Sequence, residues 1–572
     1  MHQIALNLPA NARIELWARA RGNGIDSFCI QCGSETVYHI PALPSYFDFF
    51  HYNHREASEV TLSWDPMQIE VSYAYSYDPS TVATHGITLW EFVPEGLILR
   101  TGHAIHAWMA EDLMRPKLHF SPPRMWMNDP NGLCKISNTW HLFYQFHPNS
   151  VDWGPMYWGH AISQDLFHWT HQPVFLHPEQ NLARLDATGG AFSGTALCSP
   201  NQQVAFYYTE RYPAYDHFKG YREVQKRAQA SRDLVRVTNI ETVISTRPPG
   251  VEHDFRDPKV WWEEQVGQYR MILGASLFDD PAVLLYGSPD GKDWDYLGPL
   301  YVAPTHFRKN KARSVECPDF FQLDGRWVLV MGFLGYAEPE TGRRHLLYAL
   351  IGEFDGHHFR PTGSNLQLLD FGADFYAMQS FEADGRRIAH AWLFNWETRR
   401  PGPSQYSGEL ALPRELEIDE KGRLCMLPVI ELEQTAAFIS QSGADSGTYC
   451  LPDTPFAISL SGKIEGTTIL ATQAGKPSFN IIIQGGLISI VLSQDDGKKK
   501  YTARALDPRD LTIVHDRGII EIFVDRGAIC GTRRNYTNVK PDEIRIDSAA
   551  DRNLSLIELN NLSCETNATM AG

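Results

Sequence analysis

Asn128-Asp129-Pro130-Asn131-Gly132, followed by WHLFYQF at residues 140–146, places a polar, turn-like motif just before a strongly β-prone run. The same order recurs four more times, at intervals of roughly 60 residues. The later motifs are Phe192-Ser193-Gly194, Arg256-Asp257-Pro258, Glu316-Cys317-Pro318 and Asp374-Phe375-Tyr376. The β-prone runs after them cover residues 204–209, 269–273, 327–331 and 388–394. Motifs in one phase of five repeats predict five similar structural units.

Turn residues lie between many of the paired runs, as at Asp324-Gly325 and Asp384-Gly385. Such turns predict that each unit is an antiparallel sheet of several strands. Five such sheets arranged radially form a five-bladed β-propeller, which we place at residues 116–415. In a radial arrangement one phase of the repeat corresponds to one end of the central channel. The five motifs are therefore expected to meet at a single mouth.

The repeats are flanked by two further segments that also have strand patterns. Residues 1–115 contain alternating runs at 14–17 and 60–64, so a small N-terminal β-domain of unassigned role is expected there. The charged stretch at 416–430, with its Glu420-Lys421-Gly422 turn, is interpreted as a linker. Residues 431–572 predict a β-sandwich, with strand-like runs at 456–460, 479–484, 487–492 and 519–524. The whole chain is expected to be all-β.

Composition limits the possible partners. A chain of 572 residues exceeds the size of one hydrophobic core, so several domains are expected. The net charge of −17 argues against a nucleic acid or an anionic membrane as partner. No apolar run approaches the ~20 residues that cross a bilayer. A neutral small-molecule substrate is compatible with this net charge. The composition is also compatible with a homo-oligomer.

The N-terminus and the cysteines bear on the cellular compartment. Residues 1–13 lack the basic and apolar regions of a secretory signal. Nine cysteines, an odd number spread over the chain, do not suggest a disulfide framework. We therefore expect a cytoplasmic protein with reduced thiols. The isolated Cys29-x-x-Cys32 pair has no partner pair for zinc, and two small buried side chains are the simpler interpretation.

Three acids of the motifs stand out: Asp129, Asp257 and Glu316. Taken singly, each has an ordinary structural explanation, namely a tight turn, a local ion pair with Arg256, and a solvated side chain. Acids placed independently would not be expected to share one position of a repeat. Paired carboxylates at a concave site suggest glycoside hydrolysis, with one acid as nucleophile and one as proton donor. We therefore interpret these three residues as catalytic.

The neighbouring residues supply what sugar binding requires, although each aromatic taken alone also fits packing between blades. Apolar faces for a ring could come from Trp153, Phe192, Tyr376 and Trp396. Hydrogen bonds to hydroxyls could come from Asn128, Gln145, Ser193 and Arg256, and Asp374 of the fifth motif is assigned with them.

The ordered motifs resemble those of family 32 glycoside hydrolases, the invertases and fructan hydrolases. The matching segments are Trp126–Gly132, Trp158-Gly159-His160, Phe192-Ser193-Gly194, Phe255–Pro258, Glu316-Cys317-Pro318 and Asp374–Ala377. The resemblance covers about residues 116–565 and includes a C-terminal sandwich like that of the family; the first 115 residues lie outside the usual two-domain plan. Where the family often has a Gly before a late Trp-Met pair, this chain has Ala391-Trp392-Leu393-Phe394-Asn395-Trp396.

The resemblance implies a role for each acid: Asp129 is the nucleophile, Glu316 the general acid/base, and Asp257 the transition-state stabiliser that holds fructose hydroxyls. In a retaining enzyme the two working carboxyls lie about 5–5.5 Å apart. At an effective dielectric near 20, unit charges at that distance repel by about 3 kcal/mol, or roughly two pKa units. One acid should therefore stay protonated near neutral pH, and a glutamate has the higher reference pKa. We place the proton on Glu316.

No metal and no cofactor are expected. Because C2 of a fructosyl unit is a ketal carbon, its cation is better stabilised than an aldose cation and needs no metal. The cluster Glu252-His253-Asp254 is accordingly interpreted as loop polarity.

The predicted function is the release of terminal β-fructofuranosyl units from sucrose and short fructo-oligosaccharides by double displacement. Within the enzyme class, fructosyl transfer and exo-acting levanase or inulinase activity remain alternatives. Hydrolysis of sucrose 6-phosphate ranks lower, because no Lys/Arg cluster adjoins the first motif. From other classes come a non-catalytic carbohydrate-binding propeller and a structural scaffold. The presence of Asp129 and Glu316 weighs against both.

Overall fold

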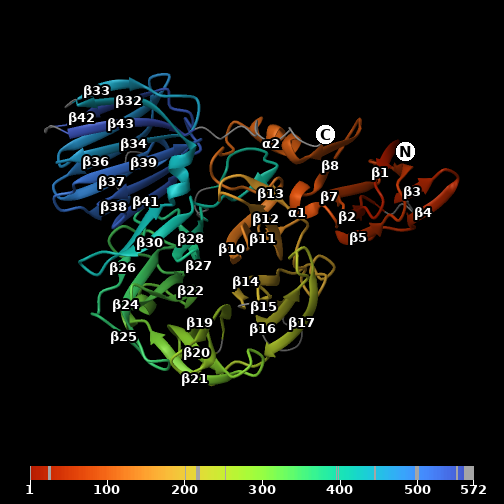
Figure 1. Ribbon diagram of the computed structural model, residues 1–572, viewed down its shortest axis with the longest axis horizontal. Coiled ribbons are helices and arrows are strands. Elements are labelled where there is room, and N and C mark those ends of the chain that lie inside the picture. Colours follow the sequence, from red (N-terminus) through yellow and green to blue (C-terminus); the bar gives the residue numbers. More distant parts are fainter. Residues whose placement is uncertain are drawn as a thin grey trace.

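The computed structural model is built almost entirely of β-strands, as the sequence predicted (Figure 1). It describes residues 2–22, 28–199, 201–213, 220–251, 253–393, 396, 399–443, 446–495, 501–548 and 552–559. The helices among these residues are short: α1 (Val82–His85), α2 (Gly102–Ala110), α3 (Thr305–Lys309) and the 3-10 turns η1 (Ile430–Thr435) and η2 (Ser493–Asp495). Within the described ranges, no helix has the length and apolar character needed to span a bilayer.

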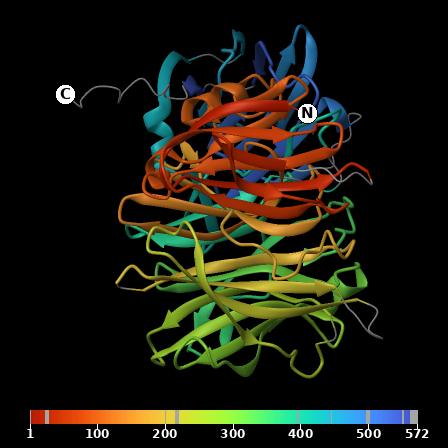
Figure 2. The same cartoon turned by 90° about the vertical axis from the view of Figure 1, so that its right-hand side faces the viewer.

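The N-terminal segment forms two antiparallel sheets, drawn red and orange in Figure 2. One has the order β1 (His2–Leu8), β6 (Ser58–Trp64), β3 (Phe28–Cys32), β4 (Glu35–Ile40). The other has the order β5 (Asp48–Asn53), β2 (Arg13–Ala20), β7 (Ile69–Tyr77), β8 (Thr88–Val93), β9 (Gly96–Thr101). Leu16, Leu62 and Trp90 belong to one buried apolar cluster, so the two sheets share a core.

Five groups of antiparallel strands follow in chain order (Figure 1), and a short parallel pair joins the first two groups into a nine-stranded sheet. The first three groups are β10 (Met125–Ile136), β11 (Thr139–His147), β12 (Pro155–Ser163) and β13 (Trp169–His171); β14 (Gly189–Cys198), β15 (Val204–Pro213), β16 (Tyr221–Ala230) and β17 (Val237–Ile244); and β18 (Phe255–Glu263), β19 (Gln268–Leu277), β20 (Asp280–Ser288) and β21 (Asp295–Val302). The last two are β22 (Ser314–Leu323), β23 (Arg326–Leu334), β24 (Leu347–Phe354), β25 (Phe359–Pro361) and β26 (Gln367–Leu368); and β27 (Tyr376–Ala383), β28 (Arg386–Trp392), β30 (Arg414–Ile418) and β31 (Leu424–Pro428).

These strands confirm the expected β-prone runs, except that β28 ends at Trp392, before the expected end of the last run, and residue 394 lies outside the described residues. The turn between β22 and β23 is also as predicted. Asp324 and Gly325 have φ angles of 50° and 74°, and two positive φ values in a two-residue loop are typical of a type I′ hairpin.

The first strands of the five groups contact one another in a closed circle. In that circle β10 contacts β14, β14 contacts β18, β18 contacts β22, β22 contacts β27, and β27 contacts β10. The circle is supported by β29 (Tyr406–Ser407), which follows β28 in the chain and pairs in parallel with the start of β10. Segments about 280 residues apart are thereby joined, because Met125 pairs with Tyr406.

The expected linker at 416–430 is wrong for most of its length. Residues 414–418 and 424–428 form β30 and β31, which pair with each other and extend the fifth group beyond β28. The charged residues mark only the hairpin turn between these two strands, around Glu420-Lys421-Gly422. A turn and a linker share the same polar composition, which explains the error.

The C-terminal segment forms two six-stranded sheets, drawn blue in Figure 1. One has the order β32 (Ala436–Gly443), β43 (Arg552–Leu559), β34 (Phe456–Gly462), β39 (Asp510–Asp516), β40 (Ile519–Val524), β41 (Ile529–Arg534). The other has the order β33 (Gly447–Cys450), β42 (Glu543–Asp547), β35 (Thr467–Gln473), β36 (Lys476–Gln484), β37 (Leu487–Leu492), β38 (Tyr501–Arg504). Side chains of both sheets, among them Ile469, Ile481, Ile513 and Ile522, are fully buried in one apolar cluster.

Buried charges join the C-terminal sheets to the segment that precedes β10. His119 contacts Asp516 through Nδ1 at 2.9 Å and Glu521 through Nε2 at 3.0 Å. Asp516 also accepts the backbone N–H groups of residues 117–119, and Arg414 of β30 donates to Glu521 at 2.7 Å. Burial alone would lower the pKa of His119, but hydrogen bonds to the two carboxylates raise it to about 9.

We predict that His119→Ala destabilises the protein by about 3–5 kcal/mol, since it leaves two buried carboxylates short of a partner. The folded-state pKa of His119 lies above its unfolded value of about 6.5. Its contribution is therefore complete below pH ~6.5 and is lost as the pH rises through about 9. The difference in urea midpoint between the wild type and the variant should shrink over this range. His39→Ala, at an exposed histidine, is the control. A difference in urea midpoint that does not change with pH would contradict the assignment of a charged His119.

Candidate active site

A cavity of about 290 Å³ opens where the first strands of the five groups meet. The sequence-predicted residues that line it are Asn128, Asp129, Gln145, Trp153, Phe192, Arg256, Asp257, Glu316, Tyr376 and Trp396. The three acids come from β10, β18 and β22, which are separated in the chain but joined in the circle of contacts. The expectation that they share one concave site is met by this placement.

A local irregularity of each strand explains how the lining is built. In all five first strands the pairing register shifts by one residue at the motif, for example between Met127 and Pro130 in β10. Such a β-bulge bends the strand and redirects its side chains. Consecutive residues of a regular strand point to opposite faces. Here Asn128 and Asp129 both line the cavity, as do the neighbours Arg256 and Asp257 and the neighbours Glu316 and Cys317. Phe192 and Tyr376 line it from the bulges of β14 and β27.

Asp129 is half-buried, and its carboxylate contacts four side chains. Oδ2 accepts from Ser193 Oγ at 2.6 Å and from Gln145 Nε2 at 3.4 Å, and Oδ1 accepts from Asn128 Nδ2 at 3.2 Å. Cys317 Sγ lies 3.5 Å from Oδ2. Burial raises the pKa of Asp129, while the hydrogen bonds from Ser193 and Asn128 act in the opposite direction. Ser193 therefore contacts the first acid rather than the open cavity.

Glu316 is held between a guanidinium and a phenol. Its Oε1 accepts from Arg256 Nη2 at 3.0 Å, and its Oε2 accepts from Tyr376 OH at 2.8 Å. Arg256 is itself buried and also contacts Glu223 and Asp254, each at 3.0 Å. One cation therefore organises several acids of the cavity wall. The predicted position of the catalytic proton on Glu316 stays a prediction.

Asp257 and Asp129 are connected through Cys317. The backbone N–H of Cys317 donates to Asp257 Oδ2 at 2.8 Å, while its thiol contacts Asp129. The three acids thus converge on residues 316 and 317. Burial is the main cause that raises the pKa of Asp257 to about 7, against the lowering effect of Arg256. The acid cluster therefore includes one carboxyl group whose pKa lies well above the ordinary value of an aspartate.

Aromatic rings form another part of the wall. Trp396 is 38% exposed and stacks on Trp126 with ring centroids 5.7 Å apart. Trp392, which the sequence did not single out for the site, packs edge-on against Trp396 and also lines the cavity. Trp153 and Phe192 meet edge-to-face at 6.3 Å. Flat apolar faces next to carboxylates suit a sugar ring.

Two arginines that the sequence did not single out also line the cavity. Arg211 lies on β15 and stacks over Tyr221, with its guanidinium carbon 3.4 Å from the ring centroid. Arg313 precedes β22 and donates to Asp254 at 2.6 Å. Neither belongs to a motif of the repeat, so only the folded chain reveals them. Asp254 was part of the cluster interpreted as loop polarity; Glu252 of that cluster lies outside the described residues.

Asp374 does not line the cavity, so its assignment to the substrate-binding set is wrong in this geometry. Its Oδ2 accepts from the backbone N–H of Arg534 at 2.8 Å and from Arg533 Nε at 3.3 Å, both on β41. In β27 the register shift lies between Tyr376 and Gln379. The residues in phase with Glu316 and Cys317 are therefore Tyr376 and Ala377, and Asp374 falls two residues before Tyr376.

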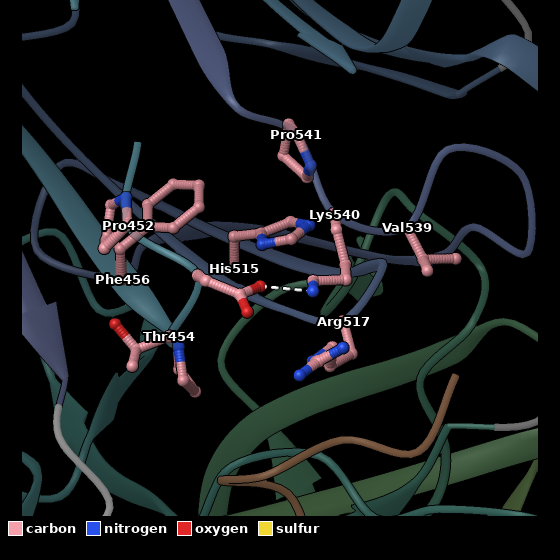
Figure 3. Close-up of a pocket in the computed structure, with 10 residues that line it drawn as sticks. Pro452, Thr454, Phe456, His515, Arg517, Val539, Lys540 and Pro541 are labelled. Carbon is pink, nitrogen blue, oxygen red and sulfur yellow. Dashed lines mark ion pairs between the residues drawn. The ribbon is translucent and has the colours of Figure 1, made fainter. Parts of the chain in front are cut away.

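A second depression, on the C-terminal sheets, is too small for a sugar. Its volume is about 10 Å³, and Figure 3 shows His515, Arg517 and Lys540 around it. Lys540 is paired with Asp453 at 2.5 Å. This depression gives no competing candidate for the active site.

Comparisons with known proteins agree with this geometry. The family described as "Glycosyl hydrolases family 32 N-terminal domain" matches residues 119–428. A sucrose-6-phosphate hydrolase of Escherichia coli is 37% identical over 467 residues, covering 77% of this chain and 93% of that protein. A raffinose invertase of Escherichia coli is 32% identical, covering 76% and 92%. The structure of a glycoside hydrolase family 32 protein from Bifidobacterium adolescentis superimposes with a TM-score of 0.86 at 24% identity, covering 98% of this chain and 99% of that one.

The superposition with the Bifidobacterium adolescentis structure includes the N-terminal sheets. In this chain, these sheets contact a loop that lines the cavity. Ser72 on β7 donates to Asn149 Oδ1 at 2.9 Å. Four residues later the same loop carries Trp153, which lines the cavity. The loop is also held by Ser150, whose carbonyl accepts from Trp126 N–H at 2.9 Å. The N-terminal segment therefore supports part of the cavity wall.

We predict that Ser72→Ala loosens the loop at residues 147–153 without unfolding the protein. Loss of one hydrogen bond of about 1 kcal/mol should speed amide exchange in that segment about fivefold. Hydrogen–deuterium exchange with peptide resolution measures this. Ser76→Ala, on the same strand, removes the hydroxyl that accepts from Trp90 and should leave the loop unchanged. Equal exchange in both variants would show that the contact does not hold the loop.

Proposed function

Because the chain belongs to glycosyl hydrolase family 32, we propose that it is a retaining β-fructofuranosidase. Its substrates are sucrose and short fructo-oligosaccharides, from which it releases the terminal β-fructofuranosyl unit. The observation that carries the proposal is the convergence of Asp129, Asp257 and Glu316 in one cavity that also presents Trp153 and Trp396.

In the first step Glu316 transfers a proton to the oxygen that bridges the two sugars, and Asp129 forms a bond to C2 of the fructosyl unit. The C2–O bond breaks, and the transition state has oxocarbenium character. The hydrogen bonds from Ser193 and Asn128 fix the Asp129 carboxylate in one orientation. The carboxylate is therefore already oriented for attack on C2 when the substrate binds. The leaving sugar departs with the proton.

In the second step Glu316 takes a proton from water while the water oxygen attacks C2. The bond between C2 and Asp129 breaks, fructose is released with its configuration retained, and both acids return to their starting states. Arg256 and Tyr376 hold the two oxygens of Glu316 during this exchange. Asp257 lies beside the fructosyl ring in this proposal and binds its hydroxyls.

The proton needed for the first step is shared within the acid cluster. Three carboxyl groups face the cavity, and Arg256 is the cation in direct contact with two of them. Like charges at short range disfavour full ionisation, and the titration then belongs to the group of acids together. The raised pKa of Asp257, about 7, supports a retained proton near neutral pH.

We also infer the architecture that positions these acids. The circle of contacts among β10, β14, β18, β22 and β27 supports a five-bladed β-propeller. We assign it to residues 116–428, extending the predicted boundary of 415 because β30 and β31 belong to the fifth group. The two six-stranded sheets support a C-terminal β-sandwich from about residue 431, and residues 1–115 are assigned to a separate β-domain.

We predict that Asp129→Asn lowers kcat for sucrose by about ten-thousand-fold or more, as expected for the loss of a nucleophile. The amide keeps the size of the side chain, so folding and sugar binding should be largely retained. Initial rates of fructose release, together with the urea midpoint, measure both properties. The exposed Asp293, changed to Asn, is the control. If Asp129→Asn keeps most of its activity, the nucleophile is another residue.

A phosphorylated sucrose is a second candidate substrate, supported by two arginines in the cavity. We ranked it low because no basic cluster adjoins the first motif, yet Arg211 and Arg313 reach the cavity from the second and fourth groups. Arg313 is partly committed to Asp254, whereas Arg211 is held by ring stacking over Tyr221. The relative in Escherichia coli named sucrose-6-phosphate hydrolase is consistent with this candidate.

We predict that Arg211→Met lowers kcat/KM for sucrose 6-phosphate at least about tenfold more than kcat/KM for sucrose, because it removes a charge-assisted contact to the phosphate. Arg211→Lys keeps the charge and should recover part of the difference. Parallel kinetics on both substrates measure the ratio. An equal effect on the two substrates would leave unphosphorylated sucrose as the assignment.

A further inference from the structure

A groove of about 990 Å³ separates the second and third groups of strands, far from the acids. One wall comes from β15 and β16, including Tyr207, Arg227 and Gln229. The opposite wall comes from the hairpin of β18 and β19 and carries Trp262 and Tyr269. The groove is more than three times the volume of the catalytic cavity, which measures about 290 Å³.

The hairpin presents an aromatic surface to this groove. Trp262 is 41% exposed and pairs across the hairpin with Tyr269, whose ring lies 4.8 Å away at 72°. Directly opposed residues of an antiparallel pair lie on the same face of the sheet. Trp261, the preceding residue, points to the other face and packs against Phe320 and Trp327. The exposed indole of Trp262 therefore has no comparable packing role.

The rest of the groove combines apolar side chains such as Leu197 and Leu234 with polar ones, and it has no excess of positive charge. Arg227 is paired with Glu241 at 2.7 Å. Of the other charged residues in the lining, Arg232 is offset by Glu264 and Asp290. Amide and hydroxyl side chains such as Gln229 and Thr238 complete it. A surface without excess positive charge does not favour a phosphate or a polyanion, whereas aromatic faces beside amides suit a neutral polyhydroxylated ligand.

The groove lies at the opposite end of the strands from the catalytic cavity. Arg256 and Asp257 are near the start of β18, and Trp262 is near its end. The five residue steps from Asp257 to Trp262 along an extended strand span about 16 Å. At this distance, a ligand in the groove is not part of a short sugar that is bound at the acids. It is held separately.

We propose that this groove is a second carbohydrate-binding site, which holds an internal stretch of a fructan chain through stacking on Trp262 and Tyr269. The proposal rests on the proposed function, because a fructan is the polymeric form of the substrate. Binding a polymer at a second point raises the effective concentration of its chain ends near the catalytic cavity. Sucrose, which is too short to use both sites, gains nothing from the groove.

Affinity electrophoresis with the Asp129→Asn protein, in gels that contain levan, inulin or dextran, tests this proposal without digestion of the polymer. We expect Trp262→Ala in that background to weaken retardation by levan or inulin about tenfold, the effect of about 1.4 kcal/mol. Trp262→Phe keeps a flat ring and should retain most of the binding. Tyr296→Ala, which removes a 36% exposed aromatic from β21 outside the groove, is the matched control.

In the active enzyme, Trp262→Ala should raise KM for the polymer while kcat/KM for sucrose stays within about twofold of wild type. Sucrose turnover reports the proposed catalytic function separately from the groove. Unchanged retardation in Trp262→Ala would overturn the second site. An equal loss in Tyr296→Ala, or equal retardation by dextran, would likewise overturn a specific fructan site at Trp262.

Discussion

The β-bulge at the start of each first strand is the constraint on which the cavity depends. A regular strand directs successive side chains to opposite faces, so it can give a cavity only every second residue. The inserted residue changes this at one position, and neighbouring residues such as Glu316 and Cys317 then contribute to one wall. Because the first strands close into a circle, the same local distortion repeated five times gathers the functional side chains at one place.

Gathering acids in this way requires a compensating charge, and Arg256 provides most of it. Its guanidinium contacts Glu223, Asp254 and Glu316 at 3.0 Å while its side chain is almost completely buried. An unpaired buried carboxylate is costly, so the cluster is tolerated only because the cation is fixed by several acids at once. Burial and the neighbouring acids raise the pKa of Asp257, and Arg256 lowers it. The contacts that make the cluster stable therefore also set the electrostatics of the cavity.

The sequence predicted the features that depend on local chemistry. It missed the residues that come together only when distant segments of the chain meet in the fold. The β-prone runs placed the second strand of each of the five groups, and the acids were found because each lies in a motif that repeats. Arg211 has no counterpart in the repeat and reaches the cavity from a second strand of its group, so no local pattern marks it. Asp374 was misplaced because its motif resembles the others while the bulge in β27 begins at Tyr376. A hairpin turn and a linker have the same composition, which hid β30 and β31.

The two ends of each first strand have different roles in the structure. At the motif end, backbone bulges, buried hydrogen bonds and ion pairs fix side chains such as Asp129, and a change in one contact is felt by its neighbours. At the other end the groups of strands diverge. There, a hairpin such as that of β18 and β19 carries exposed side chains that are not needed for packing within the circle of first strands. Trp262 can therefore be altered without disturbing the acids. A radial arrangement of sheets thus permits a rigid catalytic mouth and an independent surface site on the same strands.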